Sequence, residues 1–116
     1  MAKKRHKYGV APVEDRTFAG IVFHSKKECL RYQVLCDQAA AGEISELELQ
    51  PKFSWRTTHE AEGRAKCHVY SYKADFRYID SEGEEVIEDV KGYRTSEYRR
   101  KKRIVEYLFK IKIKEI

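Results

Sequence analysis

Two aspartates and a lysine in the C-terminal half of the chain have the types and spacing expected of a hydrolytic site. Asp75 lies in one stretch of alternating apolar and polar residues, and Asp89 and Lys91 lie two residues apart in the next. Side chains two apart on a strand share a face, so Asp89 and Lys91 are predicted to point the same way and Glu88 the opposite way. The sequence thus predicts acidic and cationic groups on one sheet surface.

A predicted hairpin brings the two aspartates together. The segment Asp80-Ser81-Glu82-Gly83 is typical of a turn, and a hairpin centred on residue 82 places Asp75 opposite Asp89, with side chains ~5 Å apart. Carboxylates this close repel one another, so we expect either Lys91 or a hard divalent cation such as Mg²⁺ to offset the repulsion. With a metal, Lys91 would orient the attacking water or stabilise charge at a phosphate during phosphodiester hydrolysis.

The same residues have a purely structural interpretation. Alternating charges are ordinary on a strand with one solvated face, and an exposed ionic ladder needs no chemistry. That ladder would contain Lys73, Asp75, Arg77, Asp89 and Lys91. From the residue types alone, both interpretations stay open.

The elements that would position these residues alternate between helix and strand. Ser25 to Glu28 matches the capping box that begins a helix, and Gly42 is a suitable residue to end it. Thr95 or Ser96 caps a second, basic helix that extends to about Phe109. Residues 44–50 are expected to be a connection, and strands are predicted at 52–58, 67–79, 85–91 and 111–115. The order helix, three strands, helix, strand indicates a central mixed sheet covered by helices.

A helix glutamate, a strand aspartate and an acidic-x-lysine triplet on the next strand resemble the motif of the PD-(D/E)xK nuclease superfamily. The elements here are Glu28, Asp75 and Asp89-Val90-Lys91. Four segments in order, 20–28, 49–53, 74–78 and 88–92, resemble more closely a family of small phage and prophage proteins that are nuclease-like and related to Holliday-junction resolvases. The resemblance covers residues 18–116 and implies an α/β, restriction-endonuclease-like core with the order αβββαβ.

The resemblance also implies roles. Asp75, Asp89 and the Val90 carbonyl would hold Mg²⁺ or Mn²⁺ in a one- or two-metal site, Lys91 would be the catalytic lysine, and Glu28 would approach the metal from the first helix. Glu28 is equally explained as the capping-box residue, and the two roles are compatible. The sequence departs from the usual motif where Ala74, in place of proline, precedes Asp75, and in having aspartate at position 89.

Length and charge agree with a DNA-binding protein of one domain. The chain has 116 residues, a net charge of +5 and a pI near 9.1. We expect residues 1–17 to form a flexible basic arm and residues 18–116 a single domain. No long apolar run or signal peptide is evident, and three cysteines without a secretion signal favour the cytoplasm, the bacterial host's if the protein is phage-encoded. No glycine-rich phosphate loop is present, so no nucleotide cofactor is expected.

Clusters of basic residues identify the expected contacts to the DNA backbone. The candidates are Lys26, Lys27, Arg94, Arg99, Arg100, Lys102 and Arg103. A branched DNA substrate would suit a homodimer that presents two sites. The rival hypothesis is a DNA-binding module that keeps a nuclease-like fold but has no catalytic activity.

Overall fold

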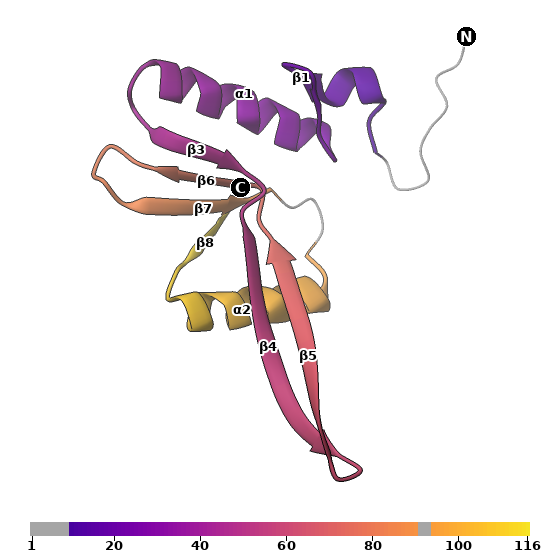
Figure 1. Ribbon diagram of the computed structural model, residues 1–116. Coiled ribbons are helices and arrows are strands. Elements are labelled where there is room, and N and C mark those ends of the chain that lie inside the picture. The colour runs from indigo at the N-terminus through magenta and orange to yellow at the C-terminus, as the bar shows by residue number, and fades with distance from the viewer. Residues whose placement is uncertain (1–9, 91–93) are drawn as a thin grey trace. The chain divides into compact units, whose positions relative to one another are not determined.

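A computed structural model describes residues 10–90 and 94–116 of the chain. It divides into two compact units, of which the first comprises residues 1–47 and 79–84 and the second comprises residues 48–78 and 85–116. Figure 1 shows the elements along the chain. Neither helix in the described part of the chain is long and apolar enough to cross a membrane.

The first unit begins with a 3-10 helix, η1 (Val13–Arg16), followed by the paired short strands β1 (Thr17–Phe18) and β2 (Ile21–Val22). The Arg16 guanidinium ties this segment together by donating hydrogen bonds to the carbonyls of Ala11 and Phe23, at 3.0 and 2.7 Å. The prediction of a flexible arm up to residue 17 is therefore wrong for residues 13–17. Residues 1–9 of that arm lie outside the described part of the chain.

Helix α1 (Lys26–Ala40) begins and ends where its capping residues predict. The Ser25 hydroxyl accepts a hydrogen bond from the Glu28 amide at 3.1 Å, which satisfies one of the donors left open at a helix start. At the other end Gly42 has a φ of +77°, and the Glu43 amide donates back to the Gln38 carbonyl at 2.9 Å. Gly42 is favoured because a side chain would strain this left-handed conformation.

Four strands form a mixed sheet in the order β3-β6-β7-β8. Their bounds are β3 (Ser45–Leu49), β6 (Phe76–Ile79), β7 (Glu85–Asp89) and β8 (Ile113–Glu115). Strands β7 and β8 are parallel, and the chain between them contains helix α2 (Ser96–Phe109), which Thr95 caps by accepting from the Tyr98 amide at 3.1 Å. The second helix and the last strand are therefore confirmed.

Two longer strands leave this sheet and pair only with each other. Strands β4 (Lys52–Ala61) and β5 (Arg64–Lys73) form a hairpin of ten residue pairs, closed by Glu62 and Gly63. Both turn residues have positive φ, as the tight two-residue turn of a twisted hairpin requires. In Figure 1 the hairpin extends away from β7 and β8, which belong to the same unit.

The structure corrects two strand predictions. The connection expected at residues 44–50 contains strand β3, and the single strand expected at 67–79 is two strands, β5 and β6, separated by Ala74 and Asp75. The break has a backbone reason, because the Ala74 amide donates to the Pro51 carbonyl and the Gln50 amide donates to the Asp75 carbonyl. Five strands, β3 to β7, therefore lie between the two helices in place of the three expected. Three of them, β3, β6 and β7, belong to the four-stranded sheet, and the β4–β5 hairpin lies between β3 and β6 in sequence.

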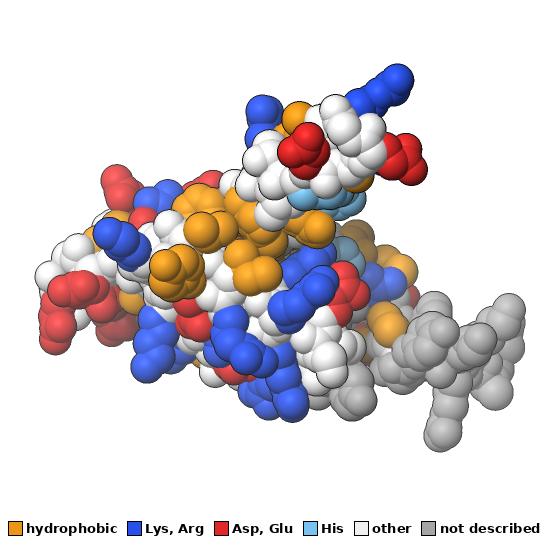
Figure 2. All heavy atoms as spheres, turned by 90° about the horizontal axis from the view of Figure 1, so that it is seen from below, with side chains coloured by type: hydrophobic (Ala, Val, Ile, Leu, Met, Phe, Trp, Pro, Cys, Tyr) orange, Lys and Arg blue, Asp and Glu red, His pale blue; other side chains and the backbone are white. Residues whose placement is uncertain are grey.

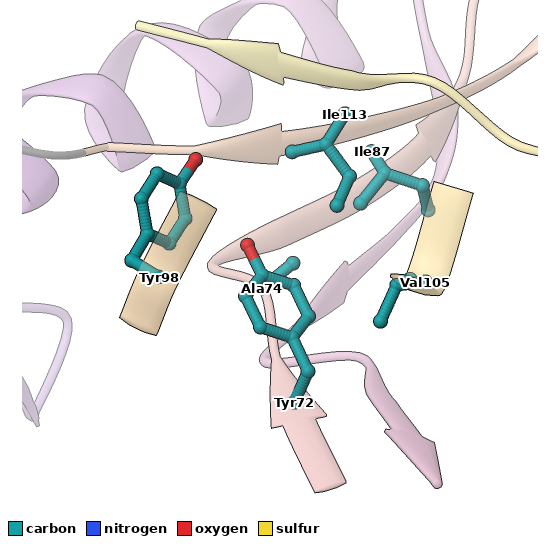
Figure 3. Packing of buried hydrophobic residues seen from close by; sticks show 6 residues of the cluster. All are labelled: Tyr72, Ala74, Ile87, Tyr98, Val105 and Ile113. Carbon is teal, nitrogen blue, oxygen red and sulfur yellow. The ribbon is translucent and has the colours of Figure 1, made fainter. Parts of the chain in front are cut away.

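The core of the second unit lies between α2 and strands of the four-stranded sheet and of the β4–β5 hairpin. Its buried hydrophobic cluster consists of Tyr72, Ala74, Ile87, Tyr98, Val105 and Ile113. Figure 3 shows these six side chains converging from β5, β7, β8, α2 and the break before β6. Burying the five side chains larger than Ala74 stabilises the unit by roughly 1.5–3 kcal/mol each, so residues close to this cluster are held in place.

Candidate active site

The predicted hairpin between the two aspartates is present. Strands β6 and β7 are neighbours in the sheet, and the turn between them is closed by the Asp80 amide, which donates to the Glu84 carbonyl at 2.9 Å. One carboxylate oxygen of Asp80 also accepts hydrogen bonds from the amides of Glu82 and Glu84, both at 2.9 Å. An aspartate that binds its own turn in this way explains why the chain reverses here.

Asp75 lies at the break just before β6, and its carboxylate contacts the backbone of β7. Its side chain accepts a hydrogen bond from the Val90 amide at 2.6 Å, and its own amide donates to the Glu88 carbonyl at 3.0 Å. The bond between Asp80 and Glu84 at the turn agrees with the predicted register, in which Asp75 would be opposite Asp89. At the other end of the hairpin Asp75 instead bonds to the backbone of Glu88, one residue earlier. The reason is the break in the strand, which releases Asp75 from regular pairing. The Asp75 carboxylate nevertheless reaches the peptide that joins Asp89 to Val90.

Asp89 is completely buried at the end of β7 and accepts a hydrogen bond from the Tyr72 hydroxyl. Burial, followed by the bond to Asp89, raises the pKa of Tyr72 above its ordinary value. Burial and the negative charge of Asp89 likewise raise the pKa of Tyr98. Both hydroxyls therefore stay protonated at neutral pH, and Tyr72 remains a hydrogen-bond donor to the carboxylate.

Glu88 is a second fully buried carboxylate, and the sequence patterns predicted no role for it. It accepts a hydrogen bond from the Tyr78 hydroxyl, whereas Asp89 binds Tyr72. Successive residues of a strand point to opposite faces, as predicted for this pair. The signal was available in the sequence, because alternation placed Glu88 on the same side as the apolar Val86 and Val90, where a carboxylate must be buried.

The other two expected catalytic residues belong to different parts of the chain. Glu28 is buried in the first turn of α1, in the first unit, with the His24 Nδ1 3.9 Å from its Oε2. Its amide binds Ser25, so the capping interpretation is confirmed for the Ser25 side of the capping box. Lys91 lies outside the described residues.

The exposed ionic ladder is wrong for Asp89. Arg77 pairs with two glutamates, Glu85 and Glu48, and the bond from its Nε to Glu85 measures 2.8 Å. Asp89, a predicted member of the ladder, has no exposed surface. Removing a carboxylate from water costs free energy even when hydrogen bonds offset part of that cost, whereas a solvated surface charge has no such cost.

The chemistry of the two aspartates fits a hard cation. Carboxylate and carbonyl oxygens are the ligands that Mg²⁺ prefers, and it usually takes one or two carboxylates and completes its shell with water. Asp75, Asp89 and the Val90 carbonyl supply donors of this kind. Within residues 10–90 and 94–116, no group of three or more His, Cys, Asp or Glu side chains is arranged to hold a metal ion. Any such site would therefore depend on the aspartate pair.

The candidate DNA-binding residues differ in how they are engaged. On the segment that contains α2, Arg94 and Lys102 both bind Glu115 of β8, and Lys102 Nζ lies 2.7 Å from its Oε1. These bonds, that of Lys102 first, lower the pKa of Glu115 to about 2. The remaining candidates are solvent-exposed, namely Arg99, Arg100 and Arg103 on α2 and Lys26 and Lys27 on α1.

The four-stranded mixed sheet with two helices makes this a mixed α/β protein with a buried, tyrosine-bound carboxylate at the end of β7. Residues 5–116 match the family described as "protein of unknown function (DUF1064)", and the chain belongs to that family. No curated protein matches the chain. No solved structure matches it either.

Proposed function

We propose that this protein is a metal-dependent DNA endonuclease with a restriction-endonuclease-like core. The observation that carries the proposal is the hydrogen bond from the Val90 amide to the Asp75 carboxylate, at 2.6 Å. It joins the predicted strand aspartate to the backbone of the acidic-x-lysine triplet, Asp89-Val90-Lys91. Two acids brought together from separate segments are what a metal-assisted hydrolase needs.

The order of elements supports the same class. When the β4–β5 hairpin is left out, helix α1, strands β3, β6 and β7, helix α2 and strand β8 match the αβββαβ order that the sequence resemblance implies. The strand β8 is parallel to β7, so the sheet is mixed, as that class requires. In this assignment the β4–β5 hairpin is an insertion between the first and second core strands.

The proposed roles come from the family resemblance, and the contacts of Asp75 and Asp89 support the roles of these two residues. Asp75, Asp89 and the Val90 carbonyl would hold Mg²⁺ or Mn²⁺, and a bound ion of this kind supplies a nucleophilic water and stabilises charge on the phosphate. Tyr72 orients the Asp89 carboxylate by donating a hydrogen bond to it. Lys91 is the proposed catalytic lysine and Glu28 the proposed additional acid. The substrate class that the resemblance implies is branched DNA.

The test is cleavage of a panel of labelled linear and branched DNAs in the presence of Mg²⁺, Mn²⁺ or EDTA. We expect cleavage with either metal and none with EDTA. Asp89→Asn should reduce the rate by about 100-fold or more, because it removes a charged ligand while the amide oxygen still accepts from Tyr72. Binding of DNA in EDTA should survive, because the phosphates are held by arginine and lysine.

Glu88→Gln is the matched control. Glu88 is as buried as Asp89, is its neighbour in sequence and also binds a tyrosine hydroxyl. Cleavage by Glu88→Gln should stay close to that of the parent. An equal loss in both variants would show that buried charge on β7 is structural. DNA binding without metal-dependent cleavage of any substrate would favour the non-catalytic DNA-binding module.

A further inference from the structure

The β4–β5 hairpin carries a large exposed surface beyond its base, where Phe53 and Trp55 pack partly against the buried cluster. Within β4 and β5, all of whose residues the structure describes, Tyr72 alone is buried. Ten-residue strands span about 33 Å at ~3.3 Å per residue. A two-stranded ribbon is marginally stable by itself, so its side chains are available to a partner over most of that length.

The two faces of the hairpin differ in composition. The pairing register sorts its side chains, because alternate residues on each strand share a face. One face carries Trp55, His59, Arg64, Lys66, His68 and Tyr70, which we name the aromatic–basic face, together with Thr57 and Ala61. The opposite face has no aromatic ring. It consists of small or uncharged residues, Ser54, Thr58, Ala65, Cys67, Val69 and Ser71, and of the charged residues Lys52, Arg56, Glu60 and Lys73.

Rings line up along the aromatic–basic face. The rings of Trp55 and Tyr70 pair across the strands with centroids 5.8 Å apart and planes only 16° from parallel. The ring of His68 lies next to that of Tyr70, with centroids 4.2 Å apart. Cross-strand aromatic pairs stabilise a ribbon. Here Trp55 and Tyr70 are only half-buried and His68 is exposed, so they also offer ring surface to a ligand.

Cationic side chains of α2 adjoin these rings. A hollow of about 160 Å³ lies where the base of the hairpin faces the helix, and it is lined by Trp55, Thr57, Tyr70, Arg100, Lys101 and Ile104. Lys101 is fixed there by a 3.5 Å contact from its Nζ to the Ser71 carbonyl. On the face of the molecule shown in Figure 2, hydrophobic and cationic side chains lie next to one another.

We propose that the aromatic–basic face and this hollow bind an unpaired strand of DNA. Unpaired bases stack on aromatic rings whatever their sequence, while arginine and lysine hold the phosphates beside them. Bases of an intact duplex are stacked on each other and cannot use the rings. The inference rests on the proposed nuclease function and narrows it, because it assigns the enzyme a substrate with a single-stranded segment next to paired DNA.

The chain contains a single tryptophan, Trp55, which makes the test direct. The full-length protein is titrated in EDTA with a short oligothymidine, and Trp55 fluorescence is followed. Stacking of a base on the indole should quench the emission saturably. A blunt duplex of the same length should quench it much less. Unchanged emission with oligothymidine, or equal quenching by the duplex, would overturn the proposal.

Three substitutions then locate the binding surface. Tyr70→Leu and Arg100→Gln should each weaken oligothymidine binding about ten-fold in fluorescence anisotropy, because they remove a stacking ring and a phosphate contact. Lys52→Gln removes the same charge as Arg100→Gln from the opposite face of β4 and is the matched control, expected to change affinity less than two-fold. If Tyr70→Leu unfolds the hairpin, Arg100→Gln on α2 still decides. Equal losses in Arg100→Gln and Lys52→Gln would contradict the assignment.

Binding in EDTA separates this inference from the proposed function. Quenching by oligothymidine without any metal-dependent cleavage would support the proposed binding surface and contradict the proposed nuclease function. Cleavage of blunt duplex without affinity for oligothymidine would support the proposed nuclease function and contradict the proposed binding surface.

Discussion

Tyr72 and Tyr78 each anchor one of two adjacent buried carboxylates on β7. Tyr72 donates to Asp89 and Tyr78 donates to Glu88, so neighbouring acids on opposite faces of the strand are each kept hydrogen-bonded. Hydrogen bonds to a buried charge are stronger than those between neutral groups, and an unsatisfied buried charge is costly. The two tyrosines are therefore as important to the candidate site as the acids.

Removal of the Tyr72 hydroxyl should destabilise the protein. We expect Tyr72→Phe to lower the free energy of unfolding by about 2 kcal/mol, because the Asp89 carboxylate loses a donor while it stays buried. Urea denaturation measures the change. Tyr70→Phe on the same strand is the control, with an expected cost within about 0.5 kcal/mol, because the Tyr70 side chain is half-exposed. A Tyr72→Phe variant as stable as Tyr70→Phe would show that the bond to Asp89 contributes little.

The two roles of Glu28 can be separated by conservative substitution. Glutamine serves at this position of a capping box as glutamate does, so Glu28→Gln should leave the melting temperature within a few degrees of the parent. If Glu28 acts on the metal, cleavage should nevertheless fall by about 100-fold. Ser25→Ala is the complementary variant, since it removes the cap seen at 3.1 Å and should cost about 1 kcal/mol without a change in cleavage per folded molecule. Undiminished cleavage by Glu28→Gln would restrict Glu28 to capping.

At the scale of elements, Glu115 ties β8 to the α2 segment. Hydrogen bonds from Lys102 and from Arg94 lower its pKa from an ordinary 4.5 to about 2. A carboxylate with a lowered pKa contributes stability that is present above its ordinary pKa and is lost as the pH falls toward the folded value. The contribution of Glu115 should therefore be complete at pH 5 and above and disappear between about pH 4.5 and pH 2.

The variant Glu115→Gln tests this contribution. It should be less stable than the parent at neutral pH, and the difference in unfolding free energy should shrink steadily between pH 4.5 and pH 2. Urea denaturation at a series of pH values measures it. Lys102→Gln, which removes the partner that lowers the pKa of Glu115 most, should lose part of the same pH dependence. A difference that stays constant across this range would mean that the ion pairs do not contribute through the charge of Glu115.

The turn residues of the β4–β5 hairpin determine how its two strands pair. Positive φ at Glu62 and Gly63 permits a two-residue turn, and the ten pairs of β4 and β5 follow from it. At the other end the same two chains are held by the bonds of Ala74 to Pro51 and of Gln50 to Asp75. These bonds separate the ribbon from the sheet and place Asp75 at the point of separation.

At the scale of the whole molecule, a net charge of +5 favours association with a polyanion. Binding to DNA should weaken linearly with the logarithm of salt concentration, with a slope of about 0.9 for each phosphate neutralised. We expect Arg99→Gln together with Arg100→Gln to reduce that slope by about one to two, measured by anisotropy on a duplex over a range of salt. Lys102→Gln should change it little, because Lys102 binds Glu115. A slope reduced only by Lys102→Gln would place the DNA on the other side of α2.

The sequence by itself determined what depends on neighbouring residues. Ser25 and Gly42 defined helix α1, Thr95 defined the start of α2, and Asp80 to Gly83 defined the turn before β7, because caps and turns are satisfied by groups a few residues away. Alternation along β7 was sufficient to place Glu88 and Asp89 on opposite faces. The proposed site residues came from the same local patterns and from a family resemblance.

Only the tertiary structure decided which strands form the sheet. Residues 67–79 alternate without interruption, yet the chain changes partners at Ala74 and Asp75, because their backbone groups bond to Pro51, Gln50 and Glu88 far away in the sequence. That exchange shifts Asp75 by one residue relative to Asp89 and makes an exposed ribbon of β4 and β5. Burial of Asp89 by Tyr72 is also a long-range contact, which periodicity cannot encode because it records only the face of a side chain and not its partner.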